Sequence, residues 1–328
     1  MNKGELLFQQ IEKPIETRGE AILKIKKAGI CGTDIAIASG DYKIETRVVL
    51  GHEIFGVIDS ISPVSKVFSI GTRVATEINA SCGNCEICKI GLKNHCLNLR
   101  TIGIDREGGF ADFVSTPIEN LHVIPDSITD EEAVFVEPLA AAIELSKMST
   151  IPEQSTIAVI GIGRLGLLIL QVLKLKNPKL LVAITRHKGY EERSTLATSF
   201  GANEILSSTD EIQSLSKITR GIGFDHVIEA TGNPAGIDLA LEIVRPRGTI
   251  HVKSTHGLPV DLDITKVAVK EVRIQGSRCG PFEEAIGMLQ DKLIKTKELI
   301  TARFALDEFG IAFAEAKSPS QIKVIFDF

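Results

Sequence analysis

The sequence predicts an α/β protein that combines a doubly wound parallel sheet with a separate β-rich domain. From about residue 139, apolar runs alternate with helical stretches, which is typical of a parallel sheet covered on both faces. Before that point, short alternating runs such as "AILKIKKAGI" are separated by loops, as expected for short strands. With 328 residues, the chain is long enough for about two domains, each with its own core.

The expected elements divide the chain into three parts. The β-rich domain spans residues 1–138 and includes the strand-like run "FADFVSTPIENLHVIP". The parallel-sheet domain spans residues 139–278, where "STIAVIGIGRLGLLILQVLKL" has the pattern of a strand, a glycine turn and a helix, and "LLVAITR", "FDHVIEATG" and "GTIHVKS" are further strands. Segment 279–328 offers one amphipathic helix and the strand-like "QIKVIFDF". Because about 50 residues are too few for a third domain, we expect this segment to return to the first one.

The charge of the chain is small and evenly distributed. The formal net charge is −5, with acidic and basic residues interspersed, so a nucleic-acid partner is not indicated. The start "MNKGELLFQQIEKPIE" lacks the apolar stretch of a signal peptide, and no run approaches the roughly 18 apolar residues needed to cross a bilayer. We therefore expect a cytoplasmic protein with no membrane partner, in which closely spaced cysteines bind metal as thiolates.

A glycine-rich turn lies between an apolar strand and a helix. Gly161, Gly163 and Gly166 form the pattern G-x-G-x-x-G, with Arg164 and Leu165 inside it. Such glycines let backbone amides approach a pyrophosphate, whose charge is favoured by the positive end of the helix dipole. The pattern alone is a weak signal, but its place between strand and helix favours a dinucleotide site over an ordinary turn.

The residues at the end of the next strand bear on the choice of cofactor. An acidic residue about 20 positions after the glycines would bind the adenosine ribose of NAD. Here Thr185 stands nineteen residues after Gly166 and is followed by Arg186. A hydroxyl and a guanidinium would bind a 2′-phosphate, so we expect NADP to be preferred over NAD. The alternative is that Arg186 is a solvated loop charge and both cofactors are used.

Four of the six cysteines lie within fifteen residues. Cys82, Cys85, Cys88 and Cys96 have the spacing C-x2-C-x2-C-x7-C, which suits a closed tetrahedral structural zinc site. Iron–sulfur ligation is the rival interpretation, but the bacterial ferredoxin pattern places its fourth cysteine after three residues and before a proline. This lobe therefore has no open position for a substrate.

A second set of ligand types could hold an open metal ion. Cys31 lies in "AGICGTDIA", and His52 and Glu53 lie in "VLGHEIFG". A cysteine, a histidine and a carboxylate form a plausible three-ligand zinc site with room for water or substrate. Taken singly, the cysteine could be a small core residue and the histidine an ordinary hydrogen-bonded side chain.

Together, "CGTD", "GHE", the four-cysteine lobe and the following G-x-G-x-x-G resemble the zinc-dependent medium-chain dehydrogenases, a family that includes alcohol, polyol and threonine dehydrogenases. The resemblance covers essentially the whole chain. It implies a GroES-like catalytic domain completed by the C-terminal segment, a Rossmann domain that binds NAD(P), and an active site in the cleft between domains. It also implies a homodimer or a homotetramer.

By the same resemblance, Cys31 and His52 are ligands of the catalytic zinc. Where the alcohol dehydrogenases have a third ligand cysteine, this chain has Glu137 in "FVEPLAAA", which is similar to the sorbitol and glucose dehydrogenases. Either Glu53 or Glu137 could then ligate, directly or through water. On a regular strand His52 and Glu53 would point to opposite faces, so joint ligation requires a bulge. Asp34 is expected to orient His52.

The resemblance assigns Thr33 to the start of a proton relay from the substrate alcohol. Many relatives have a histidine five residues after the ligand cysteine as a later relay station, and here that position is Ala36. We assign no role to Lys253, His256 or Cys279.

The predicted function is therefore hydride transfer between a secondary alcohol, polyol or sugar and NADP or NAD. An alternative from another class is a zinc-stabilised, NADP-binding regulator without turnover. A zinc-ribbon nucleic-acid binder is a more remote third possibility.

Overall fold

The computed structural model describes residues 6–63, 67–185, 191–207, 217–255 and 258–328. These residues form two compact units. The first unit comprises residues 1–137 and 282–328, and the second comprises residues 138–281. The C-terminal segment therefore belongs to the first unit.

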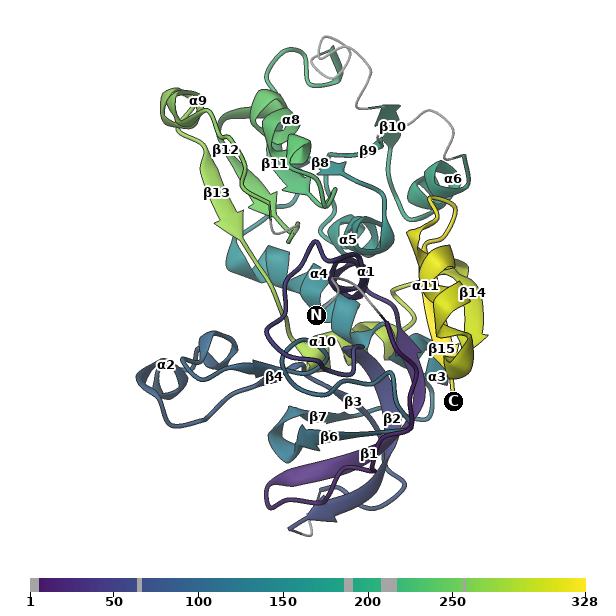
Figure 1. Cartoon of the computed structure of the whole chain (residues 1–328). Helices are drawn as coiled ribbons and strands as arrows, with labels where there is room; N and C mark the ends of the chain where they lie inside the picture. The colour runs from purple at the N-terminus through teal and green to yellow at the C-terminus, as the bar shows by residue number, and fades with distance from the viewer. Residues whose placement is uncertain (1–5, 64–66, 186–190, 208–216, 256–257) are drawn as a thin grey trace. The chain divides into compact units, whose positions relative to one another are not determined.

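The first unit is built on a mixed, mainly antiparallel sheet. Its strands are β1 (Glu20–Gly29), β2 (Glu53–Ser62), β3 (Arg73–Thr76), β6 (Phe113–Pro117), β7 (Leu121–Val123), β14 (Ile300–Ala305) and β15 (Lys323–Asp327). They run in the order β14-β15-β1-β2-β3-β7, and β6 also pairs with β1. Strand β15 pairs antiparallel with β1, so the last strand of the chain lies beside its first (Figure 1). A hairpin of β4 (Asn79–Ala80) and β5 (Arg100–Thr101) brackets the cysteine lobe.

Short helices surround this sheet. They are α1 (Gly32–Ser39), α2 (Glu86–Lys89), α3 (Asp130–Ala133), α10 (Phe282–Gln290), α11 (Phe309–Lys317) and the 3-10 turns η1 (Lys93–His95), η2 (Ile118–Asn120), η3 (Lys297–Leu299) and η4 (Leu306–Glu308). Apolar side chains of β1 and β2, such as Ile25, Ile54 and Ile58, are buried in one core cluster. Phe110, Phe313 and Phe326 belong to a second, which also contains Ile30 and Ile37 next to Cys31 and Asp34. The start of α1 is thus fixed by packing on the C-terminal helix and strand.

The second unit is a six-stranded parallel sheet. Its strands are β8 (Thr156–Ile160), β9 (Leu180–Thr185), β10 (Glu204–Ser207), β11 (Phe224–Glu229), β12 (Val244–Val252) and β13 (Arg273–Gly276). Their order is β10-β9-β8-β11-β12-β13, and every pairing is parallel. The chain runs outward from β8 in both directions, so the order reverses beside β8. In such sheets ligands bind outside the carboxyl ends of the strands at this switch point.

Helices cover the second sheet. They are α5 (Arg164–Lys174), α6 (Glu191–Ser199), α8 (Ala235–Ile243) and α9 (Ile264–Val269), while α4 (Val136–Met148) spans the division between the units. Helix α5 packs on β8 and β9, and α8 packs on β11 and β12. The buried runs of β8 and β9 are apolar without alternation, as expected for strands covered on both faces. The predicted fold class, a doubly wound parallel sheet plus a β-rich domain, is confirmed.

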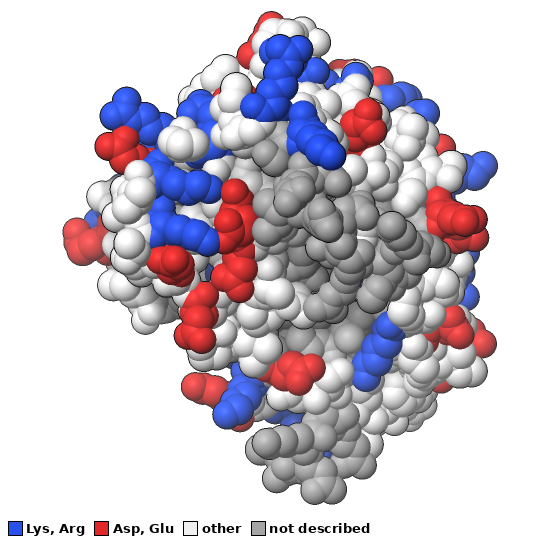
Figure 2. Space-filling view, turned by 90° about the horizontal axis from the view of Figure 1, so that it is seen from above, with Lys and Arg blue, Asp and Glu red and all other residues white. Residues whose placement is uncertain are grey.

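Among the described residues on the face drawn in Figure 2, basic side chains lie beside acidic ones. Elsewhere in the described chain, Lys266 pairs with Glu242 and Arg247 with Glu271. Within the described part of the chain, no helix combines the length and the apolarity that a membrane span requires.

Candidate metal and cofactor sites

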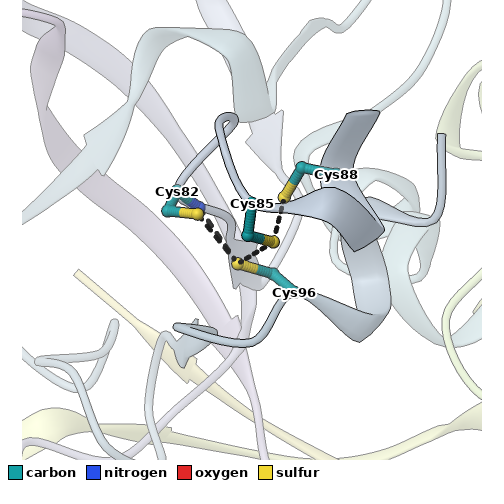
Figure 3. A group of neighbouring side chains, drawn as sticks. All are labelled: Cys82, Cys85, Cys88 and Cys96. Carbon is teal, nitrogen blue, oxygen red and sulfur yellow. Dashed lines mark hydrogen bonds between the residues drawn. The ribbon is translucent and has the colours of Figure 1, made fainter. Parts of the chain in front are cut away.

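The four cysteines of the lobe converge on one point. Cys85 precedes α2, Cys88 lies within it, and Cys96 follows the 3-10 turn η1, so short helical turns aim three sulfurs inward. Figure 3 shows these sulfurs facing one another and that of Cys82. Three sulfur pairs are 3.4, 3.8 and 3.4 Å apart. Zinc–sulfur bonds of about 2.3 Å in a tetrahedron require sulfurs about 3.8 Å apart, so the cluster fits one zinc ion.

The acidities of these thiols also favour a cation. Backbone amides of Asn84 and Cys85 lower the pKa of Cys82 to about 6. Burial, together with hydrogen bonds to neighbouring thiols, raises the pKa of Cys88 to about 11. Backbone hydrogen bonds from Leu97 and Cys88 also lower the pKa of Cys85, so without a cation the cluster favours thiolates at Cys82 and Cys85 and resists one at Cys88. A bound divalent ion removes that resistance, because it offsets the repulsion among four thiolates. His95 is exposed and stands outside this group.

Cys31, Asp34 and His52 form a second cluster in the first unit. Asp34 is fully buried near the start of α1, and its Oδ2 accepts a hydrogen bond of 2.8 Å from the amide of Cys31. Its Oδ1 accepts another of 3.1 Å from the amide of Gly51 and lies 3.5 Å from His52 Nδ1. One carboxylate thereby ties the two predicted ligand segments together. Because Nδ1 faces Asp34, the other ring nitrogen is left for a second partner.

The charges in this cluster favour a cation beside the Cys31 sulfur. Burial lowers the pKa of His52, but the negative charges of Asp34 and Cys31 outweigh it and raise this pKa well above its usual range. Burial raises the pKa of the Cys31 thiol, but the charge and hydrogen bond of His52 outweigh that effect and lower it. The pair thus favours a thiolate beside an imidazolium. A zinc ion could take the place of the imidazolium proton, so these two residues fit an open zinc site.

The loop that carries His52 is held by close glycine packing. Gly51 has φ +92°, and a Cβ there would lie 2.4 Å from the Phe110 ring. The amide of Gly109 donates to the Gly51 carbonyl at 2.8 Å. A Cβ on Gly108 would lie 2.4 Å from the same oxygen. The segment 108–110 therefore packs directly on the backbone beside His52.

We expect Gly51→Ala to destabilise the chain by about 2–5 kcal/mol, because the left-handed backbone and the overlap with Phe110 add. Gly71→Ala is the matched control: Gly71 has φ +85° but open space at its Cβ, so only the backbone cost of about 1–2 kcal/mol applies. Denaturant unfolding of both variants measures the difference. Equal losses of stability would show that Phe110 does not hold this loop.

Glu53 is held in a buried ion pair with Lys323. It begins β2 opposite Gly29 of β1, and its Oε2 contacts the Nζ of Lys323 on β15. Both side chains are 3% exposed. A Cβ on Gly29 would meet Glu53 Oε2 and lie 2.9 Å from Lys323 Cε, so the absence of a side chain at Gly29 makes room for the pair. Burial lowers the pKa of Lys323 to about 8, against the raising effect of the charges of Cys31 and Asp34.

Two predicted site residues of the first unit remain, Glu137 on α4 and Thr33 on α1. Glu137 is the second residue of α4 and is partly buried. Among the described residues, the one group of three or more ligands close enough to share an ion is the four-cysteine cluster. Thr33 lies in the first turn of α1, with its Oγ1 4.0 Å from Cys31 Sγ, and Ala36 follows on the same helix. The hydroxyl of Thr33 is thus near the expected metal position.

The glycine turn of the second unit has the shape of a phosphate cradle. Gly161 has φ +98°, and a Cβ there would lie 2.7 Å from the carbonyl of Ala230. A Cβ on Gly166 would overlap the carbonyl oxygen of Gly161, so helix and turn touch. By contrast, a Cβ on Gly163 would meet no described atom within 4 Å. Gly163 directly precedes α5, which begins with Arg164 and Leu165. Its open space therefore fits an approaching pyrophosphate.

The adenosine side of the predicted cofactor site is only partly described. Thr185 is 7% exposed and ends β9 at the carboxyl edge of the sheet. Arg186 and His256 lie outside the described residues.

Lys253 is buried at the end of β12, and its Nζ donates to the carbonyls of Ser277 and Arg278, each at 3.1 Å. Cys279 is partly buried.

Two features were missed by the sequence analysis. Lys323 is one, because nothing in "QIKVIFDF" distinguishes it from a surface lysine. The other is the bonding of Glu229 to Thr231 and to Ser254, since the strand end with Ser254 was expected near the nicotinamide but without a partner. The signal for this group was present, since Glu229 and Ser254 both stand at the ends of predicted apolar strands.

Comparison with known proteins gives matches along nearly the whole chain. The family model of the alcohol dehydrogenase GroES-like domain matches residues 17–126, and that of the zinc-binding dehydrogenase matches residues 165–291. The L-threonine 3-dehydrogenase of Bacillus subtilis is 31% identical over 97% of this chain and 94% of its own. The D-arabitol-phosphate dehydrogenase of Enterococcus avium is 31% identical over 98% of this chain and 94% of its own.

Solved structures agree with these matches. A protein described as a zinc-binding dehydrogenase from Sinorhizobium meliloti 1021, bound to NADP, superposes with a TM-score of 0.90 at 27% identity and covers 100% of this chain and 97% of its own. A protein described as an alcohol dehydrogenase from Escherichia coli CFT073, complexed with NADH, has a TM-score of 0.90 at 31% identity. The match covers 99% of this chain and 96% of that structure.

Proposed function

The chain belongs to the zinc-dependent medium-chain dehydrogenases, which are NAD(P)-linked oxidoreductases of the alcohol and polyol type, and we propose that it oxidises a polyol or sugar alcohol with NADP. The observation that carries this proposal is the cluster in which buried Asp34 joins the Cys31 and His52 segments. The relative that acts on D-arabitol phosphate supports a polyol, and Glu137, where alcohol dehydrogenases have a cysteine, favours the same class.

Cys31 and His52 would hold the catalytic zinc, which lowers the pKa of a substrate hydroxyl and so prepares hydride transfer to the nicotinamide. Asp34 Oδ1 lies 3.5 Å from His52 Nδ1, and a hydrogen bond between them would fix the ring once the other nitrogen binds zinc. Thr33, near the Cys31 sulfur, accepts the hydroxyl proton and passes it on. Because position 36 is alanine, the later steps of this relay use water or another group.

We propose Glu137, and not Glu53, as the carboxylate that completes the zinc site. The support is the contact of Glu53 with Lys323, which occupies its Oε2 in a buried ion pair. Removing the charge of Glu53 would leave the ammonium of Lys323 buried and unpaired. Glu53→Gln should therefore act mainly on stability, whereas Glu137→Gln should lower zinc occupancy at the Cys31 site. Zinc content after dialysis against a weak chelator distinguishes the two variants.

We propose that NADP is preferred over NAD, on the support of Thr185 and Arg186 and of the NADP-bound structure. The NADH complex of the other structure means that use of both cofactors is a real alternative. Arg186→Ser should lower the ratio of kcat/KM for NADP to that for NAD by about tenfold or more, because a charge-assisted hydrogen bond contributes about 1.5–3 kcal/mol. Steady-state kinetics with both cofactors measures this ratio, and an unchanged ratio would contradict the assignment.

The experiment that tests the proposed function is a metal-dependent assay. The chain, depleted of its weaker metal by dialysis and then supplied with zinc, is incubated with NADP and a panel of alcohols, polyols, polyol phosphates and sugars. We expect NADPH to form only after zinc is restored, and polyols to give the highest kcat/KM. No zinc-dependent reduction of NADP or NAD with any compound would favour a regulator that binds NADP without turnover.

We also propose that the chain forms a homodimer or homotetramer in the cytoplasm. The edge strand β13 and the neighbouring α9 expose Ile264, Val269 and Ile274, which are 65%, 78% and 41% exposed and could pack against a second copy. The four-thiolate site suits a reducing compartment. Light scattering that gives the mass of one chain would contradict the oligomer, and recovery in a secreted fraction would contradict the location.

A further inference from the structure

A compact hydrogen-bonded group joins the carboxyl ends of β11 and β12. Glu229, the last residue of β11, is 2% exposed. Its Oε1 accepts three hydrogen bonds: 2.8 Å from the Thr231 amide, 2.6 Å from the Thr231 hydroxyl and 2.9 Å from the Ser254 hydroxyl. Ser254 lies two residues beyond β12. A side chain from one strand end thus reaches the carboxylate of its neighbour.

Ser254 also holds the turn that follows β11. Its Oγ accepts a hydrogen bond of 2.7 Å from the amide of Gly232 while its hydroxyl donates to Glu229. Thr231 and Gly232 are exposed, so this turn presents its backbone to the surroundings while Glu229 anchors it from below. The hydroxyl of Ser254 is therefore the link between a buried carboxylate and an exposed turn.

The packing around this group leaves the turn little freedom. The first glycine of the phosphate turn, Gly161, approaches the carbonyl of Ala230 and the Cα of Thr231. On the other side, a Cβ on Gly236 of α8 would lie 2.4 Å from Glu229 Oε1. A shift of the turn would therefore disturb either the phosphate cradle or helix α8.

The position of the turn indicates which half of a dinucleotide it serves. Thr185, expected at the adenosine ribose, ends β9 on one side of β8. Glu229 and Ser254 end β11 and β12 on the other side of β8. A dinucleotide crosses such a sheet at the switch point, with its adenosine half beyond one neighbour of the central strand and its other half beyond the opposite neighbour. The turn 231–233 therefore belongs to the nicotinamide half.

We propose that Ser254 is a positioning residue for the nicotinamide half of the cofactor, acting through Glu229 and the amide of Gly232 to fix the turn 231–233. This inference rests on the proposed NAD(P) chemistry but is separate from the choice of substrate. Lys253 supports the same edge, because its ammonium links the end of β12 to the carbonyls that follow β13.

The test compares ligands that fill one half or the whole of the site. Ser254→Ala removes the bridging hydroxyl, and Ser254→Thr keeps it. Dissociation constants are measured for NADPH and NADH by fluorescence and for 5′-AMP, which carries only the adenosine half, by competition. We expect Ser254→Ala to weaken both dinucleotides about fivefold to tenfold and to change 5′-AMP binding less than about twofold. Ser254→Thr should restore most of the dinucleotide affinity.

Thr185→Val is the contrasting variant on the adenosine side, where 5′-AMP and the dinucleotides should weaken together. In steady-state assays, Ser254→Ala should raise KM for the cofactor with little change in KM for the alcohol. Its melting temperature without ligand should stay within about 2 °C of the wild-type value, a shift that corresponds to less than about 1 kcal/mol for a chain of this size.

Equal weakening of 5′-AMP and the dinucleotides by Ser254→Ala would overturn the inference, because the group would then support the whole domain. Unchanged dinucleotide affinity would overturn it as well. A wild-type chain that binds neither dinucleotide would overturn both this inference and the proposed cofactor. If the chain binds dinucleotides but oxidises no alcohol, only the proposed function fails. The changes in dinucleotide and 5′-AMP affinity caused by Ser254→Ala would then still test the inference.

Discussion

His52→Gln is expected to lower kcat/KM for alcohol oxidation by about a thousandfold or more. The substituted amide is a much weaker zinc ligand than an imidazole, and loss of the metal removes several kcal/mol of stabilisation from the developing alkoxide. The glutamine also leaves Asp34 as a buried carboxylate without the imidazole near its Oδ1. The measurement is steady-state turnover with saturating NADP, together with the zinc content of the purified variant.

His95→Gln is the matched control for this prediction. His95 is exposed beside Cys96 in the zinc lobe, so the same substitution there should leave turnover within about twofold. We expect His52→Gln to lose one zinc ion per chain while it keeps the ion of the four-cysteine cluster. A His52→Gln variant that retains both ions and more than a tenth of wild-type turnover would contradict the assignment of His52 as a catalytic ligand.

Cys88→Ser is expected to have the largest effect on stability. The four sulfurs match the geometry of one zinc ion, and structural zinc can contribute on the order of 10 kcal/mol to folding of the segment that binds it. The segment between β4 and β5 has short helical turns and exposes Ile90, Leu92 and Leu97, so few packed apolar contacts would hold it without metal. We expect limited proteolysis between residues 81 and 99 and a melting temperature lowered by about 10 °C or more.

Cys279→Ser controls for the loss of a thiol as such. Cys279 lies in the second unit and is not one of the four clustered cysteines, so its replacement should leave the zinc content and the proteolysis pattern of the lobe unchanged. If Cys88→Ser kept both its metal and its resistance to proteases, the lobe would not depend on zinc. Turnover of the fraction of Cys88→Ser that remains folded should fall much less than that of His52→Gln, because the lobe offers no open metal position.

The fold class and the family could be predicted from the sequence because their signals are local. Apolar strands alternate with helices after residue 139, and the glycine turn sits directly between β8 and α5. The cysteines of the lobe are close in sequence, so their convergence needs only short turns. The approach of Asp34 to Cys31 is equally local, since a carboxylate three residues into a helix reaches the amide at its start.

Contacts between distant strands could not be predicted in this way. Lys323 meets Glu53 across 270 positions of sequence, and only the pairing of β15 with β1 and of β1 with β2 brings them together. The candidate ligand Glu53 thereby acquires a partner that spacing could not reveal. Ser254 and Glu229 present the same problem, because the neighbours of a parallel strand depend on the strand order, which a single sequence does not specify.

Cys31 and His52 are proposed to share an accessible zinc ion, at which the enzyme oxidises an alcohol. The most direct test of this claim is a crystal structure grown with zinc and NADP, with diffraction data collected at the zinc absorption edge. We predict two anomalous peaks per chain, one among the four cysteines and one within about 2.3 Å of Cys31 Sγ and about 2.1 Å of a His52 ring nitrogen. A single peak at the cysteine cluster, from a sample that oxidises alcohols at full rate, would contradict the claim.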